Sequence, residues 1–506
     1  MAKLHEVLRD LVPNHYFSTN FCKMKQFKYL LPLTLLFLAI FASCGDDDFN
    51  VEDDTMVDES STLYESSSFS KACDDGTSQE LNLITVTDRG EGTGSTTWTK
   101  DNNYILNGLV FVNPGQTLII EAGTVIKGKS GQGENAAALI VARGGTILAE
   151  GTATDPIIFT SESDQLFRDP MGNLCSEGGQ SSSVNGLWGG LIVLGNAGLN
   201  SAPGETAIDG VPTTEPRGLF GGSNDADNSG VLKYVSIRHG GTDIGAGNEI
   251  NGLTLGGVGS STVIEYIEVF ANADDGIEFF GGTARVKYLA VSYCGDDGTD
   301  YDEGFRGKGQ FWLVVQDETG DSAGEHDGGT DPETAQPYAT PTIFNATYLG
   351  DSPDQKRAVR IRDNAGGYYY NSIFSSYLRG VHIELLDDEQ DSFKQLQDGN
   401  LVFNNNVFHN IGGDVFSIED QTSNGTGVDA ANAEAMNIFN ENDNTVLGES
   451  ELSFTQQVIP AENAVLEGGA APTDAFFEQV DYKGAVEPGT TNSWIMGWTR
   501  LSRELN

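Results

Sequence analysis

The sequence predicts an all-β protein whose main domain is a parallel β-helix, a solenoid of stacked coils. The first observation is a segment, residues 264–304, in which one pattern occurs twice at a constant offset of 22 residues, so that Asp275 matches Asp297 and Glu278 matches Asp300. The second is that its apolar runs alternate with period two and end on Gly, Asn or Asp, which is typical of short strands and turns. A fixed period of this length indicates a solenoid. Successive coils would stack about 4.8 Å apart.

The N-terminus predicts export from the cytoplasm. Two lysines precede an apolar run, residues 29–42, which is too short to span a membrane comfortably and leads into Ser-Cys. We interpret residues 1–43 as a signal peptide, with Met24 as the true start. The segment resembles a bacterial lipoprotein signal, in which Cys44 becomes the lipidated first residue. The alternative is an ordinary signal peptide with a chance cysteine.

Residues 44–85 form an acidic, Ser-rich segment. Few apolar residues and dense like charge favour a disordered tether. Acidic residues directly behind a lipidated cysteine resemble the surface-export signal of Bacteroidota lipoproteins. This resemblance implies a lipid anchor in the outer membrane and a protein that faces the cell exterior.

The β-helix is expected to occupy residues 86–451. Strand-length apolar runs that end on Gly, Asp or Pro recur through this region, and its length and period suggest about ten to thirteen coils. Three polar, irregular segments, 161–183, 201–230 and 317–341, are expected to be loop excursions from the coils. Three Asn-containing runs share a rhythm that predicts stacked asparagines at coil corners. These asparagines are Asn345, Asn371 and Asn405.

The last segment, residues 452–506, lacks the repeat pattern but is rich in aromatic residues. A solenoid must cover its open apolar end, so we expect this segment to be a C-terminal cap. The alternative is an aromatic platform that stacks on glycan.

The charge balance excludes some partners. The chain carries 28 Lys and Arg residues against 74 Asp and Glu residues, a formal net charge of -46. Such a surface repels nucleic acid and anionic lipid, because phosphate binding needs basic patches. It suits solubility, cation binding or a salty exterior.

The chain has 5 cysteines, of which three remain free to pair once Cys44 is lipidated and the signal peptide is removed. At most one disulfide can then form. Cys73 and Cys175 lie in polar contexts and are the candidate pair. Cys294 lies inside the repeat, where a small buried thiol is the commoner case. The pairing stays open at this level.

Six motifs spread over residues 98–499 are long and specific. They are T-V-I-K-G, A-L-I-V-A-R-G-G, W-G-G-L-I-V-L-G-N-A, N-E-I-N-G-L-T-L-G-G-V-G, D-E-G-F-R-G-K-G-Q-F-W and the terminal Y-K-G-A…G-W-T. Together they resemble a family of secreted or lipid-anchored Bacteroidota proteins. The resemblance implies a right-handed, pectin-lyase-like β-helix and brings no established reaction.

The strongest candidate site is an acidic ladder on two successive coils. It consists of Asp274, Asp275 and Glu278 on one coil and Asp296, Asp297 and Asp300 on the next. Stacked carboxylates repel each other by about 3 kcal/mol per pair at an effective dielectric of 20, so the ladder is either fully solvated or holds cations. Oxygen-only ligands without Cys or His favour calcium. Further residues that could join the ladder are Asp302, Glu303, Asp327 and Asp331.

Hydrolysis of polysaccharide is a second hypothesis. The segments around Asp274, around Asp296 and Asp297, around His326 and around Arg360 follow the order of the motifs of polygalacturonase-type glycosidases, which share this fold. Each segment departs from that family's pattern, and His326 is expected in a loop excursion rather than on a coil. Paired carboxylates on adjacent coils could supply the acid and the base of an inverting hydrolase.

Two further roles for basic residues belong to this hypothesis. Arg360 or Arg362 could hold a sugar carboxylate. A calcium-dependent lyase would instead need an Arg or Lys base, for which Arg306, Lys308 and Arg360 are the candidates.

We expect a surface lipoprotein whose β-helix binds extracellular polysaccharide or a surface protein without catalysis. The alternatives are a polysaccharide-degrading enzyme and a structural spacer on the outer membrane. Aromatic residues beside an acidic groove would favour glycan binding. Convergent, buried carboxylates with an arginine would favour catalysis, and a featureless face would favour the spacer.

Overall fold

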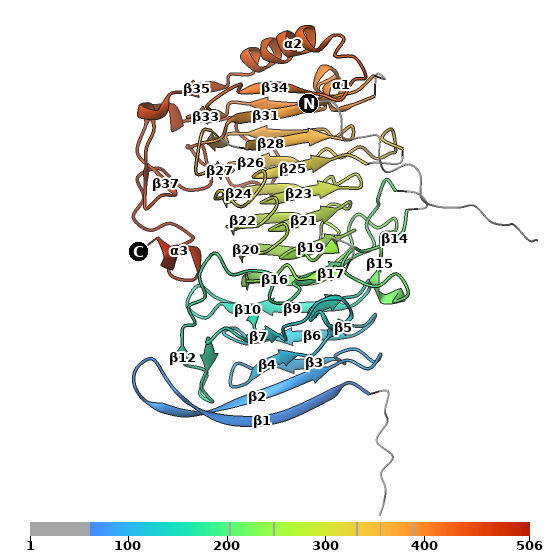
Figure 1. Cartoon of the computed structure of the whole chain (residues 1–506), viewed down its shortest axis with the longest axis vertical. Coiled ribbons are helices and arrows are strands. Elements are labelled where there is room, and N and C mark those ends of the chain that lie inside the picture. Colours follow the sequence, from blue (N-terminus) through green and yellow to red (C-terminus); the bar gives the residue numbers. More distant parts are fainter. Residues whose placement is uncertain are drawn as a thin grey trace, which may run out of the picture. The chain divides into compact units, whose positions relative to one another are not determined.

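The computed structural model describes residues 61–201, 204–245, 248–329, 332–354, 356–387 and 390–505. These residues form the parallel β-helix that the sequence predicts, with helix α2 (Val428–Glu441) at one end and the hairpin of β1 (Leu63–Ala72) and β2 (Ser78–Thr87) at the other (Figure 1). The predicted signal peptide, the lipidation site Cys44 and the tether up to residue 60 lie outside the described residues. None of the helices in the described part has the length and apolar content needed to cross a membrane.

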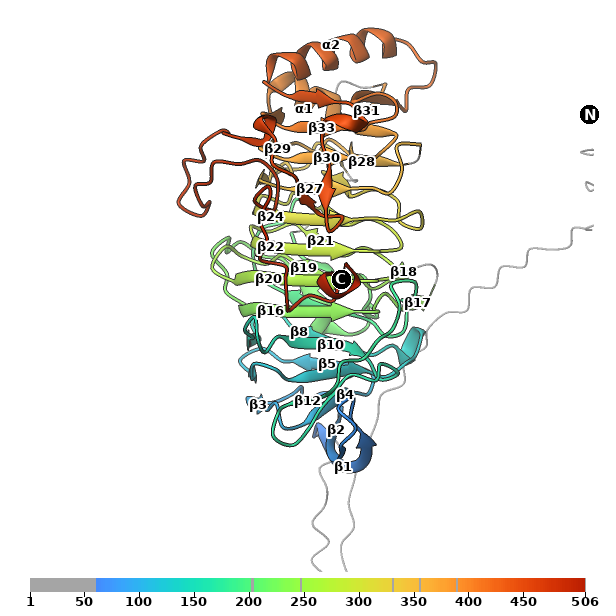
Figure 2. The same ribbon diagram turned by 90° about the vertical axis from the view of Figure 1, so that its left-hand side faces the viewer.

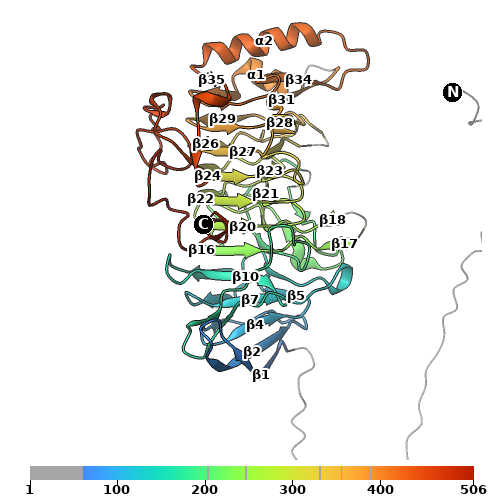
Figure 3. The ribbon, with the colours of Figure 1, turned by 60° about the vertical axis from the view of Figure 1, so that its left-hand side comes forward.

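The β-helix has three faces, each named here by its first and last strand (Figure 3). The β5–β34 face consists of β5 (Leu109–Val112), β8 (Ala138–Val141), β13 (Leu191–Leu194), β19 (Leu253–Gly256), β21 (Ile277–Phe280), β23 (Thr299–Asp302), β25 (Gly324–Asp327), β28 (Arg357–Arg362), β31 (Arg379–Leu385) and β34 (Phe416–Asp420).

Four long strands bend at a corner and serve both other faces. They are β16 (Gly230–Arg238), β20 (Val263–Phe270), β22 (Arg285–Ser292) and β24 (Lys308–Val315). Their first halves join β3 (Thr96–Trp98), β6 (Thr117–Ile120), β9 (Thr146–Glu150), β26 (Thr342–Phe344), β29 (Gly367–Tyr370) and β32 (Leu401–Asn404) in the β3–β32 face. Their second halves join β4 (Asn103–Leu106), β7 (Val125–Gly128), β10 (Ile157–Ser161), β27 (Thr347–Leu349), β30 (Ile373–Ser375), β33 (Val407–His409) and β35 (Thr445–Leu447) in the β4–β35 face.

The corner between these two faces is a ladder of stacked side chains. Tyr266 has a φ of 56° and stacks on Tyr234 at 4.2 Å and on Tyr288 at 4.3 Å between ring centroids. In later coils asparagine takes the same corner position, because its short polar side chain tolerates a left-handed backbone. The Asn405 Nδ2 donates to Asn371 Oδ1 at 2.9 Å, as expected for stacked asparagines.

Two of the three predicted excursions leave the coils. Residues 161–183 carry the hairpin of β11 (Phe167–Arg168) and β12 (Leu174–Ser176). Within it, Cys175 is joined by a disulfide to Cys73, with the Cα atoms 4.6 Å apart. Residues 201–230 carry β14 (Thr206–Ala207) and β15 (Leu219–Phe220).

The prediction of a third excursion, residues 317–341, is wrong for the middle of that segment. Residues Gly324–Asp327 form β25, which pairs with β23 and β28 inside the β5–β34 face. The sequence Gly-Glu-His-Asp conceals this strand, because its inward-facing positions carry a glycine and a histidine instead of apolar residues.

The predicted start of the folded domain is also corrected. Residues 63–87 form the β1–β2 hairpin, and β2 continues the β4–β35 face by pairing with β4. Leu81 and Val86 of β2 are fully buried. The outer strand β1 is mostly exposed and carries four serines, a glutamate and a lysine, which is why the segment looks like part of a tether.

The end of the helix is covered by α2, and residues 452–506 do not form the cap. Ala431, Ala435 and Phe439 of α2 are buried against the core. Helix α1 (Ser392–Asp398) packs beside it. The last segment, here called the tail, instead runs back along the outside of the corner (Figures 1 and 2). It carries β36 (Phe454–Thr455), β37 (Ile459–Pro460) and α3 (Leu501–Glu504).

Aromatic residues attach the tail to the corner. Trp494 packs edge-on against Tyr288 at 5.5 Å, and Trp498 packs edge-on against Tyr234 at 5.4 Å. The backbone N–H of Leu501 donates to the buried Glu268 Oε1 at 2.8 Å. A side wall needs the same apolar side chains as an end cap, so the composition of the tail does not distinguish the two.

We predict that Trp498→Ala detaches the end of the tail while the coils stay folded. Trp498 is 1% exposed and is not part of the coil interior. Losing its packing should cost about 3–5 kcal/mol of local stability, seen as faster hydrogen exchange in residues 480–505. Met171→Ala, at a side chain that is 71% exposed, is the control. Unchanged exchange in the tail would contradict the prediction.

Candidate functional site

The structure brings all six predicted ladder residues together on the β5–β34 face. Glu278 on β21 lies opposite Asp300 on β23, which in turn lies opposite Glu325 on β25. The two Asp-Asp pairs occupy the turns just before β21 and β23. A pocket of about 230 Å³, here called the acidic pocket, is lined by Asp209, Glu249, Asn251, Asp274, Asp275, Glu278, Phe280, Asp296, Asp297, Asp300 and Glu325.

The Asp-Asp-Gly turn has a local structural reason. Asp275 Oδ1 accepts a hydrogen bond of 2.9 Å from the backbone N–H of Asp297, and Asp297 Oδ1 accepts one from the backbone N–H of Ser322 in the coil beyond. A Cβ at Gly276 would lie 2.3 Å from the side chain of Val291, so this position must be glycine. Asp275 and Asp297 therefore each use one carboxylate oxygen to bind the backbone of the next coil, and the other oxygen can bind a ligand.

Burial and mutual repulsion raise the proton affinity of the ladder. Burial raises the pKa of Asp274 to about 7, and nearby Glu249 and Asp296 add to this effect. Burial also raises the pKa of Asp275 well above its usual range, as do the neighbouring carboxylates of Asp297 and Glu278. Four further carboxyl groups have a raised pKa, caused mainly by burial and then by neighbouring carboxylates. They are Glu278, Asp296, Asp297 and Asp300.

No basic residue in the described part of the chain forms an ion pair with any of the six ladder carboxylates. Like charges opposite each other in a sheet are destabilising. The arrangement is therefore stable only with bound protons or bound cations.

Oxygen atoms converge at three points of this site. Each point gathers three carboxylates with one oxygen each within 4.8 Å of the others. The groups are Asp274 with Asp275 and Asp296, Asp275 with Glu278 and Asp300, and Asp296 with Asp297 and Asp321. Asn251, whose side chain is 5% exposed, lines the same pocket, and its Oδ1 has no hydrogen-bond partner among the described residues. Asp300 Oδ1 is likewise buried without a partner. This donor set could hold a hard divalent cation.

Two arginines close the site on its far side. Arg360 donates to Glu325 at 2.8 Å and to both oxygens of Glu419. Arg362 donates to Asp327 at 2.7 Å and to Glu325 at 2.8 Å. Each guanidinium group is already paired with two carboxylates, so a sugar carboxylate would have to share the arginine with these acidic partners.

His326 is not a surface group. It lies on β25 and points into the coil interior, where its ring stacks on Tyr301 at 4.2 Å and its Nδ1 bonds the hydroxyl of Tyr369 at 2.7 Å. Burial lowers the pKa of His326 to about 3, so the imidazole is neutral. The placement in an excursion is wrong, and His326 cannot contact a substrate on the outer surface.

The three candidate lyase bases do not converge on the acidic pocket. Lys308 lies on β24 in the β3–β32 face and pairs with Asp474 of the tail. Arg306 lies in the turn before β24 and donates to both oxygens of Asp225 at 3.0 and 3.1 Å. Only Arg360 lies on the β5–β34 face, because the other two follow the turn onto a different face.

Five residues that line the acidic pocket were not predicted as part of it, namely Asp209, Glu249, Asn251, Phe280 and Glu325. Asp209 comes from the excursion at 201–230, and nothing in its sequence context indicates its position. Asn251 could have been found, because Leu253 pairs with Ile277 and so aligns Asn251 with Asp275 one coil later. Glu249 precedes this aligned position by two residues.

Comparisons with known proteins support the fold. Residues 90–499 match a family model described as a pectate-lyase like beta helix domain. No curated protein and no solved structure matches the chain.

We predict that the metal-free protein loses stability as the pH rises from 4.5 to 7.5. Folded Asp274 keeps its proton up to about pH 7, whereas its unfolded-state pKa is 3.8. The folded state therefore binds more protons in this window, and its advantage disappears as the pH rises. Asp274→Asn should reduce the fall in unfolding free energy by about 1–3 kcal/mol, measured by urea unfolding with chelator. Asp351→Asn, at an exposed site, is the control, and identical pH profiles for all three proteins would refute the prediction.

Proposed function

The chain belongs to the pectate-lyase-like β-helix family, and on this premise we propose that it binds acidic polysaccharide through calcium held in the acidic pocket. The observation that carries the proposal is the group of six unpaired carboxylates on two adjacent coils. Asp275 and Asp297 are buried, and Asp274, Glu278 and Asp300 are partly buried. A protein that only needed solubility would keep these carboxylates exposed, because burial of unpaired charge is costly.

The residues of the pocket fit calcium. All donors are oxygen atoms, and the buried Oδ1 atoms of Asn251 and Asp300 lack partners in the described structure. The second group of three, Asp275, Glu278 and Asp300, offers the most buried ligands. Calcium bound there would supply positive charge to neutralise the carboxylates and open coordination positions for oxygen atoms of a ligand.

An acidic polysaccharide is the ligand class that this chemistry favours. Without calcium, the net charge of -46 repels any polyanion. With calcium, uronate carboxylates become suitable ligands, and a polymer presents them at regular intervals. The pocket lies on an outer face of stacked coils, along which an extended chain can lie. The arginines beside the pocket are already paired with acidic side chains and His326 is buried, which favours binding over cleavage.

Cleavage of the polysaccharide remains the second candidate function. The observation that favours it is Asp274, whose pKa of about 7 leaves a protonated carboxyl group beside ionisable neighbours at neutral pH. A protonated carboxyl group at neutral pH is what general acid catalysis needs.

The proposal includes a position on the cell surface. A lipid on Cys44 and the acidic tether would hold the β-helix at the outer membrane, facing the exterior, where it could meet extracellular polysaccharide. The sequence features of residues 24–60 support this anchoring.

We predict that the full chain binds at least one calcium ion at pH 7.5, with a dissociation constant of about 10⁻⁶–10⁻³ M. Asp275→Asn combined with Asp300→Asn should weaken binding at least about tenfold by removing two charged ligands from one site. Asparagine retains the acceptor that fixes the coil, so the fold should persist. Isothermal titration calorimetry measures the affinities, with Asp351→Asn as the control. No calcium binding by the wild type would refute the proposal.

We predict that polygalacturonate or alginate retards the full chain in affinity electrophoresis with calcium but not with chelator. The double variant Asp275→Asn/Asp300→Asn should lose this retardation, because the polymer contacts the protein through the metal. New reducing ends or unsaturated products that disappear in Asp274→Asn would establish the second candidate instead. Retardation that persists in chelator would contradict a calcium-mediated contact.

A further inference from the structure

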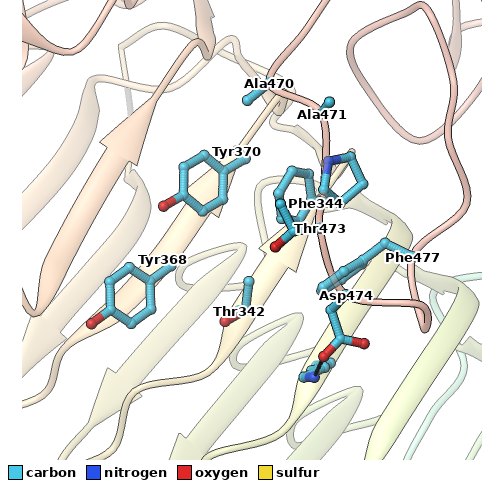
Figure 4. A pocket seen from close by; sticks show the side chains of 11 residues that line it. Thr342, Phe344, Tyr368, Tyr370, Ala470, Ala471, Thr473, Asp474 and Phe477 are labelled. Carbon is cyan, nitrogen blue, oxygen red and sulfur yellow. Dashed lines mark hydrogen bonds and ion pairs between the residues drawn. The ribbon is translucent and has the colours of Figure 1, made fainter.

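A groove of about 480 Å³ opens on the β3–β32 face, away from the acidic pocket. Its floor comes from β24, β26 and β29 and its wall from the tail (Figure 4). The residues that line this groove, here called the tyrosine groove, are Lys308, Thr342, Phe344, Tyr368, Tyr370, Ala470, Ala471, Pro472, Thr473, Asp474 and Phe477.

The wall of the groove is held in place by the coils. Asn371 at the corner binds both backbone groups of Ala470, accepting from its N–H at 2.8 Å and donating to its carbonyl at 2.9 Å. Lys308 forms an ion pair with Asp474. Four residues further on, the backbone N–H and carbonyl of Glu478 bond the side chain of Gln310 at 2.7 and 2.9 Å. The groove is therefore preformed, which reduces the entropy cost of binding.

The floor presents aromatic rings in a row. Tyr368 and Tyr370 occupy alternate positions of β29 and project to the same side (Figure 4). Phe344 is 6% exposed and is held between Tyr370 and Phe477, with centroids 4.7 Å away in both cases. Tyr368 is partly exposed and makes no ring contact among the described residues, so its ring can contact a ligand in the groove. Successive same-side residues of a strand are about 7 Å apart.

We propose that the tyrosine groove binds a neutral glycan chain without calcium. Pyranose rings have apolar C–H faces that pack on aromatic rings, and their hydroxyl groups need polar partners at the rim. The groove offers the tyrosine rings for the first and the side chains of Thr342, Thr473 and Asp474 for the second. This site goes beyond the function proposed for the acidic pocket, since it lies on another face and uses no metal.

Other ligand classes fit the groove less well. A peptide added as a strand needs a free sheet edge, but β29 is paired with β26 on one side and β32 on the other. Nucleic acid needs unpaired cations, and the only basic residue that lines the groove, Lys308, is neutralised by Asp474. The same neutralisation gives no advantage to an anionic glycan.

The test uses the full chain and a panel of neutral polysaccharides, namely xylan, glucomannan, mixed-linkage β-glucan and hydroxyethylcellulose, in affinity electrophoresis with chelator. We expect retardation by at least one polymer. Tyr368→Ala combined with Tyr370→Ala should weaken it by about tenfold or more. Both side chains are partly exposed, so the fold should tolerate their loss. Tyr64→Ala, at a tyrosine that is 37% exposed on β1, is the matched control.

A second variant blocks the groove without removing its rings. Thr473→Trp places a bulky side chain in the wall and should abolish retardation while leaving calcium binding by the acidic pocket unchanged. Absence of retardation by every neutral polymer, or equal retardation of the wild type and the tyrosine variant, would overturn the inference. Retardation only by acidic polymers and only with calcium would overturn it too, while leaving the proposed function intact.

Discussion

Backbone hydrogen bonds between parallel strands place each residue of this β-helix directly over its counterpart in the previous coil. The pairing holds without a shift from β20 to β22 and from β21 to β23. Any side chain that recurs in the sequence must therefore stack on itself in space. For tyrosine at the corner and for apolar residues in the interior this stacking is favourable. For aspartate and glutamate the same geometry enforces contact between like charges.

The acidic pocket follows from that constraint. The repeat places Asp275 opposite Asp297 and Glu278 opposite Asp300. The second carboxylate of each Asp-Asp-Gly turn is also structural, because it accepts a backbone hydrogen bond from the next coil. Stacking also orders the coil interior behind the pocket. There Tyr301, His326 and Tyr369 form a stacked, hydrogen-bonded column. A rigid interior of this kind prevents the carboxylates from moving apart, so their repulsion is relieved only by protons or cations.

The sequence reveals what repeats, and the structure departs from expectation where repetition ends. The 22-residue offset is sufficient to predict the fold and to bring six carboxylates together, because register follows from periodicity. It cannot place Asp209, which reaches the pocket from an excursion. It also misplaces β25, where a buried histidine replaces an apolar residue, and the tail, whose aromatic residues suit a side wall as well as a cap. A polar residue that faces the coil interior, or a segment that packs against distant coils, does not recur at a fixed spacing, so the sequence period does not reveal it.

The distribution of cations argues that the charge of the pocket is not a by-product of an acidic composition. On the β3–β32 face, Lys233, Lys287 and Lys308 pair with Glu265, Glu478 and Asp474, and two of these pairs hold the tail. On the β5–β34 face, Arg360 and Arg362 pair with Glu325, at the edge of the pocket, and with Asp327 and Glu419 beyond it. Cations are thus present beside the ladder on β28 and on the neighbouring face, yet none pairs with the six ladder carboxylates in the described structure. Because an unpaired buried carboxylate is costly, a ladder kept free of its own cations is suited to receive one from solution.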